Sequence, residues 1–300
     1  MSFEAFLRQL HTLNSSLETL AAIGAELRLR QDEHTGDAGV RSLLQNVVHK
    51  IDPTILDEIN PSQAQSALGL IRSSFRQAMD LLEKPERAPG WVYEDPVVLD
   101  SQGQASRLMV RGIETAAGQR ADLAAKLQQP GMFLDAGAGA GWLTIEAAQS
   151  WPALNVVAVD PWPPALDLAR KNLAQSSVAA RVEFRLQRIE ELTDEAVFAL
   201  AWLPAPFIGE EAMAAALERV YQALRPGGWL IVGLYPPTPD ELGQILTKLR
   251  IVRSGGHPWT ATEIGERLRT LGFESIETFS PMPPVLFVLG QRAEGTNKSS

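Results

Sequence analysis

The stretch that most constrains this chain runs from Met132 to Trp142. An apolar segment ends there in the acid Asp135, and a loop with glycine at every second position follows before a helical pattern begins. The order of strand, glycine turn and helix start is typical of a nucleotide-binding crevice in a parallel α/β sheet. Glycine accepts positive φ and lets a ligand approach the main chain, while a helix start offers free N–H groups. The stretch therefore predicts a nucleotide-type ligand at the end of a central strand.

Strands and helices alternate from residue 131 to the end of the chain. Alternating units of this kind imply a mostly parallel sheet with helices on both faces. A short turn at 281–284 separates the last two strands, so we expect that pair to be antiparallel. The expected strands are 132–135, 155–160, 180–186, 197–203, 229–234, 273–279 and 285–289. The expected helices are 102–128, 164–173, 210–224, 240–251 and 260–271.

Residues 1–88 show a different, all-helical pattern. Positions at alternating four- and three-residue steps are apolar except for Gly24, namely Phe6, Leu10, Leu13, Leu17, Leu20 and Leu27. Two interpretations stay open: a helical cap on the main domain, or a homodimer surface, because the stripe is almost a heptad repeat. A capping box at Ser15 would start a second helix there, and 40–51 and 62–82 are further helical segments. We expect three regions, 1–88, a ligand-binding domain at 89–292 and a flexible tail at 293–300.

Composition excludes several classes of function. The net charge of −9 argues against a nucleic-acid partner, which needs a basic face. The chain has no cysteine, hence no disulfide and no thiolate nucleophile, and its histidines and acids form no metal-ligand pattern. No apolar run is long enough to span a bilayer, and the first residues lack the features of a signal peptide. These observations predict a cytoplasmic protein with no membrane partner and no metal.

The spacing of the loop glycines separates two kinds of nucleotide ligand. A dinucleotide fingerprint needs G-x-G-x-x-G, whereas here the third glycine comes one residue early and an acid precedes the first. The pattern Asp-x-Gly-x-Gly-x-Gly resembles motif I of class I S-adenosylmethionine-dependent methyltransferases. That resemblance implies a Rossmann-like fold whose loop wraps the methionine part of S-adenosylmethionine, leaving S-adenosylhomocysteine as product. The residues it assigns to the loop site are Asp135, Gly137, Ala138, Gly139 and Gly141.

Two further motifs extend the resemblance over about residues 100–290. Asp160 ends the second strand, nineteen residues after Gly141, and matches the acid that binds the ribose hydroxyls in the family. Pro161 follows it in the same expected site. The alternative is that Asp160 merely caps the next helix. Leu224-Arg225-Pro226-Gly227-Gly228 before the fifth strand is a frequent turn in the family, and its role is structural.

The sequence departs from the family at two positions. Many relatives place an adenine-binding Asp after the third strand, where this chain offers Gln187, Arg188 and Ile189 for the same part of the cofactor. Ala199 stands in the fourth strand where an Asp is common. A rival interpretation is therefore a protein that binds S-adenosylmethionine or S-adenosylhomocysteine without transferring a methyl group. An NAD-dependent oxidoreductase is a third.

The acceptor side of the expected site is less specified. Trp202 and Phe207 lie at the carboxyl end of the fourth strand and would suit a small apolar acceptor, or they are core residues. Tyr235 follows the fifth strand at the same edge. His257, in a glycine-rich loop, is a candidate general base, with a solvated loop histidine as the alternative. The expected reaction is methyl transfer to a small molecule, with oxygen favoured and nitrogen or carbon as alternatives.

Overall fold

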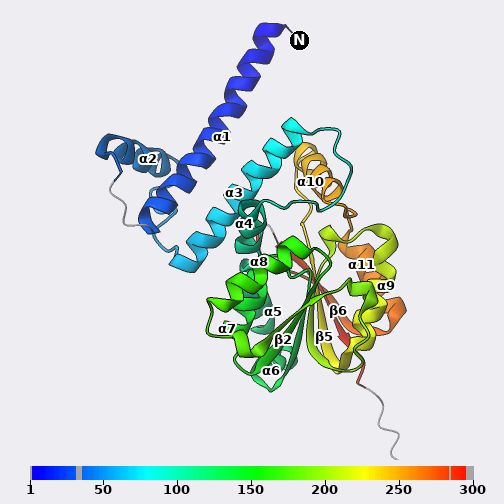
Figure 1. The fold of residues 1–300 in the computed structure, drawn as a ribbon. Helices are drawn as coiled ribbons and strands as arrows, with labels where there is room; N and C mark the ends of the chain where they lie inside the picture. The colour runs from blue at the N-terminus through cyan, green and yellow to red at the C-terminus, as the bar shows by residue number, and fades with distance from the viewer. Residues whose placement is uncertain (1, 32–35, 284, 295–300) are drawn as a thin grey trace, which may run out of the picture. The chain divides into compact units, whose positions relative to one another are not determined.

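The computed structural model describes residues 2–31, 36–283 and 285–294. The chain divides into two compact units, Met1–Glu83 and Lys84–Ser300 (Figure 1). Most of the tail expected to be flexible, residues 295–300, lies outside the described residues, as does Pro284 in the turn expected before the last strand.

The first unit consists of the helices α1 (Phe3–Gln31), α2 (Ala38–Ile51) and α3 (Pro61–Glu83). Its small core joins all three helices through Leu27, Val48, Leu56, Ala64 and Leu68. The alternative helix start at Ser15 is wrong, because α1 is continuous there. The hydroxyl of Ser15 donates to the carbonyl oxygen of His11 at 3.1 Å, a bond that a serine inside a helix can make without capping a new one.

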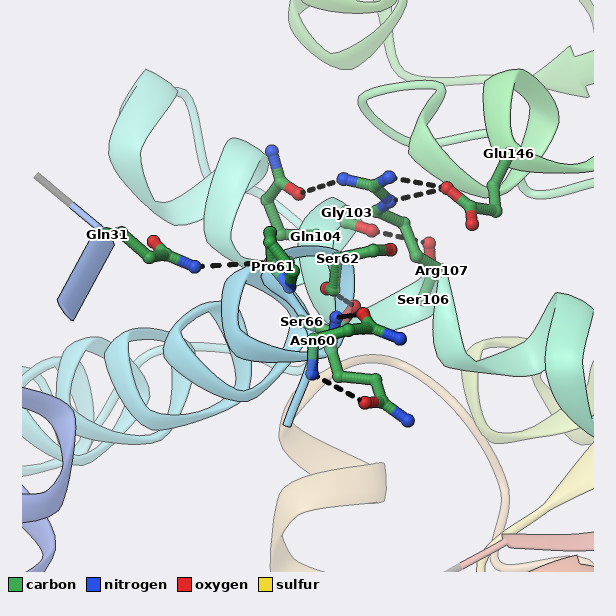
Figure 2. A network of polar contacts seen from close by, with 11 residues as sticks. Gln31, Asn60, Pro61, Ser62, Ser66, Gly103, Gln104, Ser106, Arg107 and Glu146 are labelled. Atoms are coloured by element: carbon green, nitrogen blue, oxygen red, sulfur yellow. Dashed lines mark hydrogen bonds and ion pairs between the residues drawn. The ribbon is translucent and has the colours of Figure 1, made fainter. Parts of the chain in front are cut away.

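A reciprocal cap starts α3. The N–H of Gln63 donates to the side-chain oxygen of Asn60 at 3.0 Å, and the N–H of Asn60 donates to the side chain of Gln63 at 2.9 Å. Figure 2 shows Asn60 and the amide of Gln31, which donates to the carbonyl oxygen of Pro61 at 3.2 Å. These bonds hold the end of α1 against the beginning of α3 and satisfy N–H groups that a helix start leaves open.

The described part of the second unit contains a seven-stranded sheet with the order β3-β2-β1-β4-β5-β7-β6. The pairs among the first five strands are parallel, and β7 is antiparallel to both β5 and β6. The expected mostly parallel sheet with a final antiparallel pair is confirmed. The strands are β1 (Gly131–Ala136), β2 (Leu154–Asp160), β3 (Val182–Leu186), β4 (Phe198–Pro204), β5 (Leu224–Leu234), β6 (Phe273–Met282) and β7 (Val285–Arg292).

Helices cover both faces of this sheet, as Figure 1 shows. On one face α5, α6 and α7 close a core built on Phe133, Leu200, Trp229 and Phe287. On the other face α9 and α11 close a core built on Leu134, Leu203 and Val232. The helices of the second unit are α4 (Pro96–Ser106), α5 (Leu108–Ala117), α6 (Ala121–Gln128), α7 (Trp142–Ser150), α8 (Pro163–Ala174), α9 (Glu210–Ala223), α10 (Glu241–Arg253) and α11 (Ala261–Leu271).

The prediction of a single helix over 102–128 is wrong, because the structure has three helices in this part of the chain. The first begins early at Pro96, where the carboxylate of Asp95 accepts the N–H of Val97 at 2.8 Å. Arg107 lies at the break between α4 and α5. Its guanidinium pairs with Glu146 of α7 at 2.5 Å, and both side chains are largely buried (Figure 2). The ion pair therefore connects the junction of α4 and α5 to α7, the helix that follows the glycine loop.

The capped helix expected before the last two strands is confirmed. Thr260 and Glu263 form the reciprocal capping box of α11, and Gly272 ends the helix with φ at +90°. Gly227, which the structure includes in β5 where the sequence predicts a turn before that strand, also has positive φ, at +72°. Both glycines occupy left-handed conformations that side chains rarely adopt.

Candidate functional site

The glycine loop lies where the strand order reverses. β1 pairs with β2 on one side and with β4 on the other, so the crevice beyond its carboxyl end is the topological switch point of the sheet. Ligands of open α/β sheets bind at such a crevice. Across it, a Cβ added to Gly137 would lie 3.2 Å from the ring of Pro204, the last residue of β4. The loop and the end of β4 therefore form adjacent walls.

All three loop glycines adopt positive φ, at +78° for Gly137, +54° for Gly139 and +79° for Gly141. They serve different purposes. A Cβ at Gly141 would come within 2.8 Å of the ring of Phe184, so this glycine lets α7 approach the sheet. A Cβ at Gly139 would meet nothing within 4 Å, so its face is open to a ligand. The expected close approach between ligand and main chain is possible at Gly139.

The loop is fixed to the neighbouring strand by its own N–H groups. Those of Gly137 and Ala138 both donate to the carbonyl oxygen of Val159, at 2.8 and 3.0 Å. The N–H of Gly139 donates to the carboxylate of Asp160 at 2.8 Å. The structure thus brings together the loop and the acid at the end of β2, which lie 21 positions apart.

Asp160 is 8% exposed and accepts two backbone N–H groups. One carboxylate oxygen takes the bond from Gly139, and the other takes the N–H of Trp162 at 2.8 Å. Burial raises the pKa of Asp160 above its ordinary value, and the two backbone donors oppose this shift. The bond to Trp162 supports the local capping role, but each carboxylate oxygen has a second lone pair. The same group can therefore also accept ribose hydroxyls.

Asp135 is more deeply buried, with 1% of its surface exposed. One oxygen accepts the hydroxyl of Thr144 at 2.5 Å, and within the described residues the other oxygen has no hydrogen-bond partner. Burial raises the pKa of this carboxyl to about 7, opposed by the Thr144 bond and reinforced by the charge of Asp160. A buried acceptor without a donor is costly, and a ligand ammonium would supply one. The sequence interpretation did not anticipate Thr144, which precedes Ile145 in an unremarkable helix pattern.

The residues expected around an adenine follow β3 directly. The N–H of Gln187 donates to the carbonyl oxygen of Asp160 at 3.2 Å, which places this loop beside the acid. The side-chain amide of Gln187 donates to the carbonyl oxygen of Glu191 at 2.9 Å. Arg188 is exposed and pairs with Glu190, while Ile189 is buried in the core beneath α9. Pro161 is exposed at the start of the β2–α8 connection.

The structure assigns Trp202 to the core, the second of the two interpretations of its sequence. Its side chain is 5% exposed and meets the ring of Phe287 edge to face, with 5.5 Å between centroids. The ring lies over β5 so closely that a Cβ at Gly233 would overlap it. Trp202 therefore offers little surface to an acceptor, because Gly233 in the next strand leaves room for the indole against one face of the sheet.

Phe207 is exposed after β4 and belongs to a cluster of rings. Trp91 meets it edge to face at 5.5 Å, and Tyr93 meets Trp91 at 5.0 Å. Sequence reasoning missed Trp91 and Tyr93 as site residues. The repeated aromatic positions after the proline-rich 84–90 stretch were the available signal, but nothing local indicated which strand end they would reach.

His257 does not stand alone in its loop. The Nδ1 atom of its ring lies 3.5 Å from the carboxylate of Glu210. Its backbone N–H donates to the carbonyl oxygen of Ile208 at 3.2 Å. This loop therefore packs on the connection that follows β4. Tyr235 is half-buried after β5, with the guanidinium of Arg250 5.9 Å from its ring centre.

The described parts of the chain also bear on metal binding and on membrane insertion. No group of three or more histidines and acids there is arranged to hold a metal ion. Among the helices described, none is long and apolar enough to cross a membrane. A surface hollow of about 580 Å³ lies between α5 and α7, lined by Arg111, Glu114, Thr115, Glu146 and Ser150, and it contains none of the expected site residues.

The sequence matches known methyltransferases over its central part. Residues 133–228 match a family model described as a methyltransferase domain. A malonyl-[acyl-carrier protein] O-methyltransferase from Xylella fastidiosa is 32% identical over 121 residues, which cover 38% of this chain and 39% of that relative. The chain spans less than half the length of the curated relatives that it matches.

Solved structures with the same fold cover nearly the whole chain. An O-methyltransferase family protein from Burkholderia thailandensis has a TM-score of 0.67 at 15% identity, covering 98% of this chain and 99% of that one. Human N-acetylserotonin methyltransferase, solved with S-adenosylmethionine, has a TM-score of 0.62 at 18% identity, covering 97% and 99%. At sequence identities this low, the structural similarity shows that the fold is shared and nothing more.

The raised pKa of Asp135 predicts a pH dependence of stability. The folded state holds this proton up to about pH 7, whereas the unfolded chain releases it near the ordinary value of 3.8. The free energy of unfolding should therefore fall as pH rises between these values, by up to about 1.4 kcal/mol per pH unit. Urea unfolding of the wild type and of Asp135→Asn at several pH values measures this. We expect a shallower fall in the variant, and parallel curves would contradict the assignment.

Proposed function

We propose that this chain is a class I S-adenosylmethionine-dependent methyltransferase and that it transfers a methyl group from S-adenosylmethionine to a hydroxyl oxygen of a small molecule. One observation supports the proposal most directly. The open face of Gly139 lies beside the buried carboxylate of Asp160, at the switch point of the sheet. A nucleoside whose ribose binds that acid fits this arrangement.

The residues present suit each part of S-adenosylmethionine. The unpartnered oxygen of Asp135 is a buried acceptor for the donor groups of the methionine end. Asp160 can accept the ribose hydroxyls, and the loop from Gln187 to Ile189 lies beside it for the adenine. No phosphate is involved, which agrees with two buried carboxylates in the crevice. When bound, the cofactor supplies an already activated methyl group on its sulfonium.

The protein's own contribution is then positioning and proton removal. Holding an acceptor in line with the methyl group can supply effective molarities on the order of 10⁵ M or more. For the proton of a hydroxyl acceptor we propose His257 as general base. Glu210 faces its Nδ1 at 3.5 Å, which favours a proton on that nitrogen and leaves Nε2 free to accept one. Phe207 and Tyr235 are the proposed acceptor-side walls.

The names of two relatives agree with oxygen as acceptor atom. The Xylella relative is named as an O-methyltransferase, and the Burkholderia structure is described as an O-methyltransferase family protein. The runner-up function is a cofactor-binding protein without turnover, for which Ala199 and Gln187 are the sequence arguments. Isothermal titration with S-adenosylhomocysteine and NADH, followed by a screen of hydroxyl acceptors, separates these functions. Preferential NADH binding would reject both, and tight S-adenosylhomocysteine binding without any turnover would favour the runner-up.

Asp160→Ala should weaken cofactor binding. Loss of the carboxylate removes the acceptor for the ribose hydroxyls, and the dissociation constant of S-adenosylhomocysteine should rise about tenfold or more, which corresponds to about 1.4 kcal/mol. Titration calorimetry measures the change. The exposed Asp167→Ala on α8 is the matched control and should bind as the wild type does. An unchanged constant in Asp160→Ala would remove this residue from the site.

His257→Ala should slow turnover without affecting cofactor binding. Loss of a general base typically costs about 10²-fold or more in rate, measured here as S-adenosylhomocysteine formed with the acceptor that the screen identifies. The control is His49→Ala, an exposed histidine on α2. Equal rates for the two variants would show that His257 is a solvated loop residue.

We also propose that α1 joins two copies of this chain. Its first half leaves seven large apolar side chains between 38% and 72% exposed, namely Phe3, Phe6, Leu7, Leu10, Leu13, Leu17 and Leu20. An exposed apolar stripe of this length is typical of an interaction site. Its near-heptad spacing suits a second helix of the same kind, and a two-fold axis would pair the stripe with itself.

Sedimentation velocity tests the homodimer. We expect the wild type to sediment as a dimer and the double variant Leu13→Gln, Leu17→Gln as a monomer, because two polar amides interrupt the middle of the stripe. Replacing Thr12 and Thr19 by glutamine changes side chains off the stripe and should leave the dimer intact. A monomeric wild type, or a dimeric leucine variant, would overturn the proposal.

A further inference from the structure

A short strap, defined here as residues 87–95, connects three separate loops of the second unit. At one end the N–H of Gly90 donates to the carbonyl oxygen of Arg253 at 3.0 Å, and Arg87 donates to the carbonyl oxygen of Gly90 at 2.8 Å. At the other end Trp162 donates its indole N–H to the carbonyl oxygen of Tyr93 at 2.7 Å. The strap therefore reaches from the end of α10 to the β2–α8 connection.

The strap carries two of the three rings of the aromatic cluster. Trp91 and Tyr93 belong to it, and Phe207, on the connection after β4, is the third. The guanidinium of Arg87 lies 5.3 Å from the ring centre of Tyr93, a cation–π distance. Trp91 and Tyr93 are half-buried and Phe207 is exposed, so each of the three residues keeps part of its surface in contact with solvent.

The strap also lies against the loop of the proposed general base. Gly255, two residues before His257, has φ at +83°, and a Cβ there would lie 3.0 Å from the Cα of Gly90. A side chain at this position would force the two segments apart. The strap and the loop that contains His257 therefore both pack on the connection after β4, which carries Phe207.

Trp162 connects this assembly to the cofactor crevice through its two N–H groups. Its backbone N–H donates to one carboxylate oxygen of Asp160, and its indole N–H donates to the strap, at 2.8 and 2.7 Å. A shift of Trp162 would disturb both contacts, since both donors belong to one half-buried residue.

We propose that Trp162 is a positioning residue that couples occupancy of the crevice to the order of the aromatic strap, whose rings form the wall for a planar aromatic acceptor. This inference rests on the proposed function. A ribose bound by Asp160 fixes the carboxylate, the fixed carboxylate holds the Trp162 backbone, and the indole then holds Tyr93. By linkage, an acceptor stacked on Trp91 or Tyr93 strengthens cofactor binding by the same factor.

The chemistry of the wall indicates the acceptor class. Exposed aromatic rings bind flat aromatic ligands by offset stacking or edge-to-face contact. Because these rings lie beside the loop of His257, the acceptor that fits is a phenol-like ring whose hydroxyl can reach His257. Cofactor should bind before this acceptor, because the wall is ordered from the crevice side.

Hydrogen–deuterium exchange of the full-length protein tests the coupling with S-adenosylhomocysteine as probe. Trp162→Phe keeps an aromatic ring and the backbone N–H but removes the bond to Tyr93. Peptides covering the strap should exchange about fivefold faster in this variant than in the wild type. Saturating S-adenosylhomocysteine should slow strap exchange about threefold or more in the wild type and not in the variant.

Trp142→Phe is the matched control, because its indole donates a bond of equal length, 2.7 Å, to Asp100 on α4. It should leave strap exchange at the wild-type level. Equal strap exchange in wild type and Trp162→Phe, or equal protection by the probe, would overturn the coupling. A wild type that does not bind S-adenosylhomocysteine would reject the proposed function instead, and the exchange rates without probe would still report on the Trp162 bond.

Discussion

The site depends on one buried carboxylate and the two backbone N–H groups that it accepts. Asp160 takes the N–H of Gly139 from the glycine loop and that of Trp162 from the next connection, both at 2.8 Å. Burying a carboxylate is costly unless donors compensate it, and here the two backbone N–H groups both stabilise the acid and tie the loop to the end of β2. The same contact brings the end of β2, the loop and, through the indole of Trp162, the strap into one arrangement.

The fold supplies this contact through the strand order. Because β1 lies between β2 and β4, its glycine loop has an acid on one side and Pro204 on the other. The proposed methyl-donor site uses Asp135 of β1 and Asp160 at the end of β2, which provide carboxylates without a phosphate-binding group. The aromatic rings and the His257–Glu210 pair gather on the β4 side. In the proposed function, one side of the crevice binds the methyl donor and the other side forms the wall for the acceptor.

Local sequence patterns were sufficient for the sheet and the cofactor loop. Glycine spacing, the acid that ends β2 and the capping box at Thr260 depend on neighbours within a few residues, and all three appear in the structure as expected. Other features depend on distant partners. The break at Arg107 requires Glu146, 39 positions away. The core position of Trp202 requires a glycine in another strand, and the strap requires Trp162, 69 positions from Tyr93. No periodicity carries such information.

A crystal structure of the protein with S-adenosylhomocysteine tests the central claim most directly. The account predicts ribose hydroxyls within hydrogen-bond distance of the Asp160 carboxylate, the methionine end beside the open face of Gly139, and the sulfur directed toward the connection after β4. A ligand bound elsewhere, or a ribose that makes no contact with Asp160, would contradict it.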